Sequence, residues 1–302
     1  MVSAPTIRPQ ARRRAQPVAA PRKRTRSWSL TAVTTVMLIY TLLPLAWLFI
    51  SATKTQDNLL GSFGLWFHGE FALFDNIGKT FTYQNGIYLR WLGNTVFYVV
   101  IGAGGATLLS TLAGYGLAKF AFPGRKAVFA VILGAVAVPP TALAVPTFLL
   151  FAKAGITDTV WAVIIPSLMV PFSLYLMWTF SRDAVPDEIL ESARVDGAGE
   201  FRIFFKLAVP LLSPGLVTAL LFNVVVTWNN LFLPLIMLRD RNLYPITLGI
   251  YSWNQQAQTV GGDVVFNLVI TGSLLAIVPL IAAFLLLQRY WQSGLAVGSV
   301  KQ

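Results

Sequence analysis

Three things are scarce in this sequence: it has no cysteine, a single histidine, and charged residues at only 12% of its 302 positions. The absence of cysteine excludes a disulfide framework, a cysteine-ligated zinc site and a thiol nucleophile, and His68 alone cannot form a histidine-rich metal site. A soluble domain carries charge on about a quarter of its residues, so this chain lacks the polar surface of an ordinary cytosolic enzyme. With 56% hydrophobic residues and a mean hydropathy of +0.66, the composition indicates a polytopic membrane protein.

Long uncharged segments hold most of the hydrophobic residues. A helix needs roughly 20 apolar residues to cross the hydrocarbon core, and six segments meet that length. They lie near residues 28–50, 92–118, 127–152, 160–180, 214–238 and 264–287, and none contains Asp, Glu, Lys, Arg or His. Backbone groups in lipid must pair within their own segment, so each is predicted to be a helix, with interruptions where prolines occur. The predicted fold class is an all-α membrane protein with six transmembrane helices, and the small residues at 102–106 favour close helix packing.

The six segments also lack the side chains that perform chemistry inside a membrane. Ion-coupled carriers usually bind their coupling ion through intramembrane carboxylates or histidines, and all 12 acidic residues lie outside these segments. The segments hold no catalytic cluster for an embedded protease or transferase, and the chain has no GxxxxGK[ST] phosphate-binding loop. An ion-coupled secondary carrier and a membrane-embedded enzyme are therefore disfavoured, and any uphill transport must draw its energy from another chain.

Basic residues are unevenly distributed along the chain. Eight of the 23 Lys and Arg residues lie within residues 1–26. The tail 1–27 is predicted to be disordered and to hold the N-terminus in the cytoplasm, rather than to bind nucleic acid or anionic lipid. With the N-terminus inside, the inner segments contain 17 Lys and Arg residues and the outer segments contain six. Because basic residues accumulate on the cytoplasmic side, we predict a multi-pass plasma-membrane protein with both termini cytoplasmic.

The inner segment between residues 181 and 213 is unusual because it holds six of the 12 acidic residues. Pro186 is expected at the first position of a helix, and Asp196-Gly197 predicts a turn after it. A second helix is expected to carry an apolar stripe and to end at Pro210. The stripe consists of Phe201, Phe204, Phe205 and Ala208. On physical grounds such a helix pair fits two roles about equally: lying on the membrane interface, or docking into a groove of a soluble partner.

Motifs in this segment resemble the EAA loop of the permeases of binding-protein-dependent ATP-binding cassette (ABC) importers. The matching residues are Glu191-Ser192-Ala193, Asp196-Gly197-Ala198 and Val209-Pro210, with mild departures at Ser192, Leu207 and Val209. Other motifs resemble sugar-importer permeases, and the ending of the chain is similar to the maltose-type permease of the MalG class. These motifs comprise Gly114–Phe120, Phe122–Arg125, Val138–Pro140, Trp228–Pro234, Gln288–Tyr290 and Gly294–Lys301. The likeness extends from about residue 90 to the end of the chain.

The resemblance implies a type I ABC importer permease fold with a cytoplasmic pair of coupling helices, and a shared assembly. This chain and a second permease of the MalF type form the pathway, a dimer of ATPase subunits binds ATP and Mg, and an extracytoplasmic solute-binding protein delivers the sugar. The chain itself then carries no cofactor, no metal and no ATPase site. By position, the ATPase contact is assigned to Glu191, Ser192, Ala193, Asp196, Gly197 and Ala198. The tail 294–302 is expected to extend toward the ATPases.

The resemblance also implies a contact on the outer side of the membrane. The loop between the last two spans, roughly residues 242–262, is expected to reach into the sugar cleft of the solute-binding protein. Its candidate contact residues are Tyr251, Trp253 and Asn254.

Uncharged polar side chains in two segments suit the pathway of a sugar, which needs hydrogen-bonding groups and flat aromatic faces. The candidates in the fifth segment are Asn223, Thr227, Trp228, Asn229 and Asn230. Asn223, Thr227 and Asn230 are expected on one helical face, and Ser167 and Tyr175 of the fourth segment share a face by the same spacing. Hydrogen bonding between helices accounts for these polar stripes equally well.

The predicted organisation has four parts. They are a basic tail (1–27), a first transmembrane helix with an extracytoplasmic loop (28–91), a permease core (92–290) that contains the EAA loop 186–212, and a C-terminal tail (291–302). The predicted function is that of a permease subunit that imports a sugar under the action of a separate ATPase dimer. An ion-coupled secondary carrier is the alternative.

Overall fold

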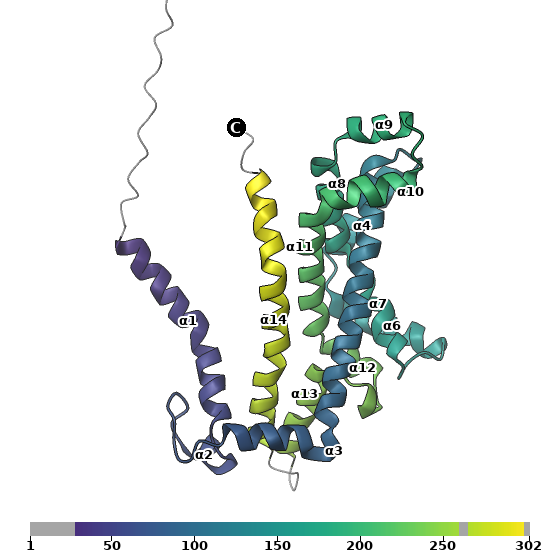
Figure 1. Ribbon diagram of the computed structural model, residues 1–302. Helices are drawn as coiled ribbons and strands as arrows, with labels where there is room; N and C mark the ends of the chain where they lie inside the picture. Colours follow the sequence, from purple (N-terminus) through teal and green to yellow (C-terminus); the bar gives the residue numbers. More distant parts are fainter. Residues whose placement is uncertain (1–27, 260–264, 299–302) are drawn as a thin grey trace, which may run out of the picture. The chain divides into compact units, whose positions relative to one another are not determined.

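The computed structural model describes residues 28–259 and 265–298, which belong to two units (Figure 1). The smaller unit ends at Leu45, and the larger unit begins at Ala46. Three predicted features fall outside the described residues: the tail 1–27, the part of the outer loop at 260–262, and the last four positions of the C-terminal tail.

The first helix, α1 (Trp28–Ala52), has the length and composition of a membrane span. Its 25 residues include no charged side chain. At 1.5 Å per residue the helix extends over about 37 Å, enough to cross the hydrocarbon core. The helix predicted at 28–50 is therefore confirmed.

The larger unit is helical, and its described residues contain no β-strand. Its elements are α2 (Gln56–Gly61), α3 (Leu73–Tyr98), η1 (Val99–Ala103), α4 (Gly104–Lys119), α5 (Arg125–Val136), α6 (Pro140–Lys153), α7 (Val160–Ser167), α8 (Pro171–Ala184), α9 (Asp187–Val195), α10 (Glu200–Ile203), η2 (Phe204–Ala208), α11 (Val209–Trp228), α12 (Phe232–Met237), η3 (Arg241–Leu243), α13 (Ile246–Gln258) and α14 (Phe266–Gly298). The elements η1 and η2 are π-helical turns that run on into α4 and α11, and η3 is a 3-10 turn. The prediction of an all-α membrane protein is confirmed.

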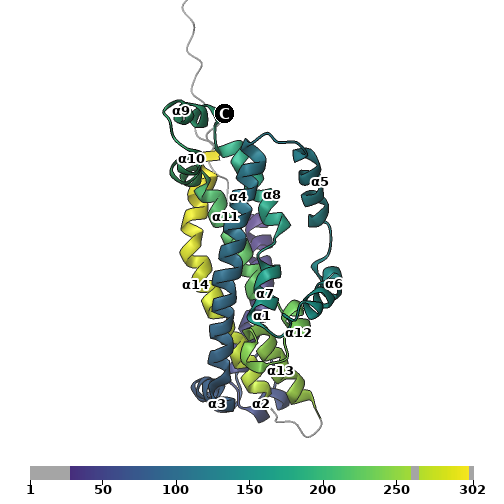
Figure 2. The same ribbon diagram turned by 90° about the vertical axis from the view of Figure 1, so that its right-hand side faces the viewer.

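Four helices, α4, α8, α11 and α14, run side by side in the larger unit (Figures 1 and 2). Helices α4 and α8 pack closely at Gly114, which has no side chain to hold them apart. A Cβ at this position would lie only 2.7 Å from the backbone nitrogen of Trp178. At Gly102 an added Cβ would lie 3.1 Å from the side chain of Ser167. Small residues in the second predicted segment thus allow the close packing that the sequence predicts.

Prolines divide two of the predicted spans. The segment 127–152 forms α5 and α6, which are bent by 106° at a short break, instead of one helix. Pro139 precedes Pro140 and has an extended backbone (ψ 128°), because a following proline ring disfavours the helical conformation. Val170, which precedes Pro171, separates α7 from α8 for the same reason. The described residues contain six candidate spans if α5 and α6 count as one, and five otherwise.

The fifth predicted span is displaced along the chain. A continuous helix runs from α10 through η2 and α11 to Trp228, whereas the sequence predicts 214–238. The expectation that Pro210 ends the preceding helix is wrong, because Pro210 lies in the first turn of α11, directly after the π-turn η2. The wider π-turn makes room for a ring that would clash with a carbonyl in a regular α-helix. At the other end, Asn229 Nδ2 donates to the Val225 carbonyl (2.9 Å), and this side-chain bond accompanies the end of the helix.

The end of the larger unit opposite α9 and α10 contains α2, the first half of α3, α13 and the start of α14 (Figure 1). Helix α3 begins well before the second predicted span and is kinked at residues 83–86, where the backbone leaves the helical conformation. After the kink, Tyr88 and Trp91 are fully buried and pack against Trp253 of α13. The segment 51–91, expected as a loop, is therefore largely helical, because its aromatic side chains take part in a core.

Candidate functional site

A pair of short helices, α9 and α10, projects from one end of the larger unit (Figure 1). Asp187 and Glu188 occupy the first turn of α9, where the positive end of the helix dipole favours them. Gly197 lies between the two helices with a φ of +79°, a left-handed conformation that glycine adopts without a steric cost. The predicted helix–turn–helix is confirmed, except that Pro186 is the N-cap of α9 (ψ 137°) and not its first helical residue.

Apolar side chains anchor this α9–α10 loop to the bundle. Leu190 of α9 and Ile203 of α10 are 1% and 0% exposed. They belong to a buried cluster that also contains Tyr115 of α4, Val185 after α8 and Phe204 of η2. Full burial of an aliphatic side chain stabilises by roughly 1.5–3 kcal/mol, so these contacts hold the loop as a rigid projection.

The residues assigned to an ATPase contact occupy two environments in the loop. The exposed members are Glu191, Ser192, Asp196 and Gly197. The other two, Ala193 and Ala198, are half-buried and pack against the core beneath the loop. The exposed members are accessible to a partner, and the two alanines support the backbone that presents them.

The predicted apolar stripe of the second helix is divided between the core and the surface. Phe204 and Ala208 are buried, whereas Phe201 and Phe205 are 80% and 55% exposed. The four positions span about 100° of the helix surface, and the bundle covers only the edge with Phe204 and Ala208. Phe201 and Val195, which is 88% exposed, give the loop an apolar surface beside its acidic residues.

Two ion pairs stabilise the loop, one across its turn and one at the start of α9. Across the turn, Arg194 Nε donates to Glu200 Oε1 at 2.6 Å. At the start of α9, the Lys119 ammonium donates to Asp187 Oδ1 at 2.8 Å and to the Val185 carbonyl at 2.6 Å. The hydrogen bond from Lys119, together with its positive charge, lowers the pKa of the Asp187 carboxyl.

Sequence reasoning did not assign Lys119 or Asp187 to the site. The two residues are 68 positions apart in the chain, and no periodicity connects positions so distant. The one indication in the sequence is that Lys119 lies within the motif Gly114–Phe120, but the motif does not show which residue Lys119 contacts.

Buried polar residues of α11 join three helices. Asn223, which is fully buried, donates through Nδ2 to Thr107 Oγ1 of α4 (3.0 Å) and to Ser173 Oγ of α8 (3.1 Å). Thr227 and Trp228 on the same helix are also buried, at 9% and 6% exposure. For Asn223 this geometry favours hydrogen bonding between helices over contact with a passing solute, because no part of the side chain is accessible.

Asn229 and Asn230 lie beyond the end of α11. The single helical face expected for Asn223, Thr227 and Asn230 does not form, because the helix stops at Trp228. The Asn230 carbonyl instead accepts a hydrogen bond from Thr247 Oγ1 of α13 (3.0 Å). Asn229 is exposed and Asn230 is half-buried.

Ser167 and Tyr175 lie on two different helices. Ser167 is the last residue of α7 and Tyr175 belongs to α8, so the break at residues 168–170 prevents the shared face that their spacing predicts. The Ser167 hydroxyl donates to the Val163 carbonyl at 2.7 Å. Tyr175 is 37% exposed, and its ring stacks on that of Trp178 with centroids 6.0 Å apart, so it presents an accessible aromatic side chain.

The residues assigned to a binding-protein contact lie on α13, at the end opposite α9. Trp253 is fully buried among three aromatic residues of α3, so its assignment as a contact residue is wrong. Its large ring forms part of the core at this end of the unit. The prediction treated the segment as an exposed loop, and the local sequence does not show that the ring packs against α3. Tyr251 and Asn254 are half-buried, and part of each side chain is accessible.

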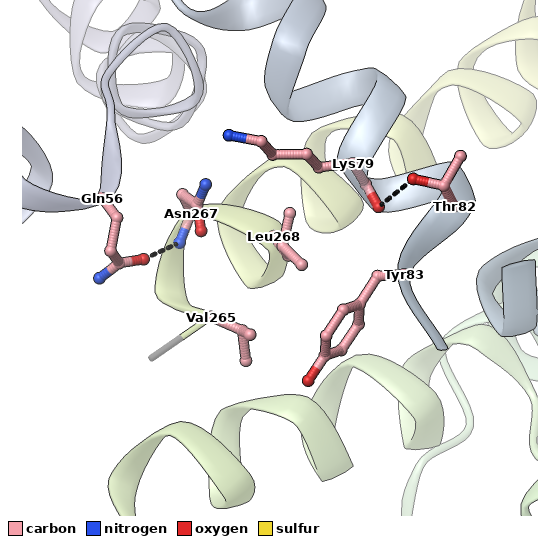
Figure 3. A pocket seen from close by; sticks show the side chains of 7 residues that line it. All are labelled: Gln56, Lys79, Thr82, Tyr83, Val265, Asn267 and Leu268. Carbon is pink, nitrogen blue, oxygen red and sulfur yellow. Dashed lines mark hydrogen bonds between the residues drawn. The ribbon is translucent and has the colours of Figure 1, made fainter. Parts of the chain in front are cut away.

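A cavity of about 350 Å³ lies at the same end, between α2, α3 and the start of α14 (Figure 3). It is lined by Gln56, Lys79, Thr82, Tyr83, Val265, Asn267 and Leu268. Gln56 Oε1 accepts a hydrogen bond from the backbone N–H of Asn267 at 3.0 Å. The lining offers amide and hydroxyl groups, and the described residues contain no group of three or more acidic or histidine side chains that could hold a metal ion.

Asp158 ties the turn between α6 and α7 to the segment after α12. It has a φ of +58°, and its Oδ1 accepts the backbone N–H groups of Asp240 (2.9 Å) and Arg239 (2.8 Å). Its own N–H donates to the Met237 carbonyl at 2.9 Å. The hydrogen bonds from Asp240 and Arg239 lower the pKa of the Asp158 carboxyl.

Known proteins with similar sequences and folds are membrane transport components. Residues 106–296 match the profile of a family described as "Binding-protein-dependent transport system inner membrane component". The chain is 30% identical to the arabinooligosaccharides transport system permease protein AraQ of Halalkalibacterium halodurans, over 91% of this chain and 96% of the relative. It is 31% identical to the lactose transport system permease protein LacG of Rhizobium radiobacter, over 89% and 94% of the two chains.

The similarity extends to a solved structure. A chain in the crystal structure of a bacterial ABC transporter involved in the import of the acidic polysaccharide alginate has a TM-score of 0.75 with this chain. The alignment covers 87% of this chain and 95% of that one, at 19% sequence identity. At this identity the comparison establishes a common fold.

Proposed function

Because the chain belongs to the family of inner membrane components of binding-protein-dependent transport systems, it is a permease subunit of an ABC importer, and we propose that its substrate is a carbohydrate. Membership of this family favours the importer over an ion-coupled carrier. An importer of this kind works with a second permease, an ATPase and a solute-binding protein. The observation that carries the proposed mechanism is the α9–α10 loop, which is anchored on one side and exposed on the other.

We propose that the α9–α10 loop docks into a groove of an ATPase subunit. Its exposed face combines the acidic Glu191 and Asp196 with the apolar Val195 and Phe201, a mixture that suits a groove on a soluble protein. A rigid helix transmits the movement of such a partner because little of it is lost in bending the loop. ATP and Mg bind to the ATPase subunits in this proposal, and this chain hydrolyses no ATP.

A second permease, of the MalF type, completes the proposed pathway. Helix α5 has no buried residue, and apolar side chains such as Val131 (71% exposed) are available to a partner or to lipid. Phe129 of α5 contacts Trp178 of α8, on which the accessible Tyr175 stacks. A pathway between the two permeases would run past the Tyr175 ring if the second permease covers this face of α5 and α8.

A carbohydrate is proposed because the similar permeases from Halalkalibacterium halodurans and Rhizobium radiobacter are named for arabinooligosaccharides and lactose. The six segments predicted as spans hold no charged side chain, which suits a neutral polar solute. In the proposed orientation the solute-binding protein docks at the end that carries α13, and α9 faces the cytoplasm. Helix α14 ends on the same side of the larger unit as α9 (Figure 1), which supports a cytoplasmic C-terminus, and the basic residues that precede α1 in the sequence favour a cytoplasmic N-terminus.

Purification and reconstitution test this proposal. In mild detergent, an ATPase and a second permease should co-purify with the chain. Proteoliposomes that contain this complex and its binding protein should accumulate labelled arabinooligosaccharide or lactose with ATP, and not with a non-hydrolysable analogue. The chain alone should accumulate neither sugar. Accumulation by the chain alone under an ion gradient would contradict the proposal.

A further inference from the structure

Lys119 has a charged side chain that is almost completely buried. The side chain is 4% exposed, whereas each side chain in the other three ion pairs of the described residues is at least 38% exposed. A buried ammonium group is costly unless it is paired and hydrogen-bonded. The contacts of the Lys119 ammonium therefore indicate the role of this residue.

The Lys119 ammonium connects three helices. Lys119 is the last residue of α4, Val185 is the C-cap of α8, and Asp187 is the first residue of α9. The last carbonyls of a helix lack partners within the helix, and a cation near them interacts favourably with the helix dipole. At the Val185 carbonyl, the ammonium gives α8 both a hydrogen-bond donor and a nearby positive charge. It also pairs with the Asp187 carboxylate, which begins α9.

Helices α4 and α8 are themselves joined closely enough to move together. Five residues before Lys119, the backbone of Met177 and Trp178 passes so close to Gly114 that no side chain fits between the two helices. Close-packed interfaces of this kind transmit displacement instead of absorbing it. The chain joins the α9–α10 loop to α8 through Val185 and Pro186 and to α11 through η2, whereas α4 has no covalent connection to the loop.

We propose that Lys119 ties the end of α4 to the junction of α8 and α9, so that movement of the α9–α10 loop turns α4 and α8 as one body. This rests on the proposed function, in which an ATPase moves the loop, and it names the contact through which the movement enters the bundle. Lys119 and Asp187 are positioning residues, because they act through α9. Without their contact the loop keeps its connections to α8 and α11 and the buried anchor Leu190, so the fold persists while the polar link to α4 is lost and coupling weakens.

Substitutions in the complete complex test this contact. Lys119→Met removes the ammonium, Lys119→Arg keeps a cation, and Asp187→Asn removes only the charge of a side chain that is 73% exposed. Lys126→Met, at an exposed lysine in the first turn of α5, is the matched control. In proteoliposomes the measurements are labelled sugar uptake, ATP hydrolysis stimulated by the binding protein, and the melting temperature of the complex.

The expected result is a change in the ratio of transport to hydrolysis. Lys119→Met should lower the sugar imported per ATP about tenfold, Asp187→Asn should lower it by a smaller factor, and the control should not change it. Lys119→Arg should retain part of the native ratio. An unchanged ratio in Lys119→Met overturns the proposal, and if that variant does not assemble, an unchanged ratio in Asp187→Asn overturns it. Absence of ATP-dependent uptake by the native complex would instead overturn the proposed function.

The absence of cysteine in this chain allows a direct second test. The double variant Lys119→Cys, Asp187→Cys loses the native contact, and a short bismaleimide cross-linker replaces it with a covalent one. The experiment requires the other subunits to have their own cysteines replaced. Cross-linking should raise the transport-to-hydrolysis ratio of the double variant toward the native value. An unchanged or lower ratio after cross-linking overturns the proposal, because the loop then has to move relative to α4.

Discussion

Gly114 of α4 lies directly against the backbone of Met177 in α8: a Cβ on Gly114 would be 2.8 Å from the Met177 carbonyl carbon. A backbone atom cannot move aside as the end of a flexible side chain can, so this contact sets the distance between the two helices. The sequence indicates small residues at 102–106, but this approach to the α8 backbone occurs about two turns further along the helix, near its end at Lys119.

Gly114→Ala is expected to force α4 and α8 apart. Overpacking of this kind should lower the free energy of unfolding by about 1–3 kcal/mol, and uptake should fall with it. Gly116→Ala is the matched control in the same helix, because nothing lies within 4 Å of a Cβ at that position. The measurement is thermal unfolding of the purified complex in detergent. Equal melting temperatures for the two variants would contradict the close approach.

Gly197→Pro is expected to abolish uptake without removing the protein from the membrane. Proline holds φ at about −65°, whereas Gly197 has a φ of +79°, so the turn between α9 and α10 cannot form in the variant. Nothing lies within 4 Å of a Cβ at this position, so the effect is one of backbone conformation and not of crowding. Gly199→Ala, at a residue with a φ of −70° and equally open surroundings, is the control. Uptake and the amount of protein in the membrane fraction are measured together, and normal uptake by Gly197→Pro would refute the coupling role of the loop.

Asn223→Ala is expected to loosen the bundle without changing the affinity for sugar. The side chain is fully buried and hydrogen-bonds to Thr107 and Ser173, so its loss should cost about 1 kcal/mol of stability. A double-mutant cycle with Ser173→Ala measures the coupling between the two residues. Asn229→Ala, at an exposed residue just beyond the same helix, serves as the control. A changed sugar concentration for half-maximal uptake, at an unchanged melting temperature, would place Asn223 on the pathway instead.

Asp158→Asn is expected to destabilise the protein in a pH-dependent way. The backbone N–H groups of Asp240 and Arg239 lower the pKa of the Asp158 carboxyl in the folded state, so its charged form adds stability. That contribution is fully present above the unfolded carboxyl pKa of about 3.9 and is lost as the pH falls through the lowered folded value. The variant should therefore melt at a lower temperature than the native protein near pH 7, and the difference should shrink below about pH 4.

Asparagine suits this test because it tolerates the positive φ of +58° at this position. The substitution therefore removes the charge and leaves the backbone conformation available. A difference in melting temperature that stays constant between about pH 3 and pH 7 would contradict the assigned role of the carboxylate.

Local patterns predict several features of this molecule well. The uncharged segments predict where helices of the bundle lie, and proline and glycine predict the break before α6 and the turn at Gly197. The same patterns are wrong at Pro210, where a π-turn accommodates the ring within a continuous helix, and at Trp253, which is buried instead of exposed. Both errors concern what a neighbouring element contributes, which local sequence does not contain.

Composition and hydrophobic segment length are sufficient to identify a helical membrane protein. Lipid accepts long apolar helices and few charges, and that constraint acts on each segment separately. Which side of each helix is covered depends on packing between segments far apart in the chain. The burial of Asn223 between α4 and α8 and the contact of Lys119 with Asp187 arise in this way. Burial and pairing are properties of the folded arrangement, so these two contacts became visible only when the helices were assembled in space.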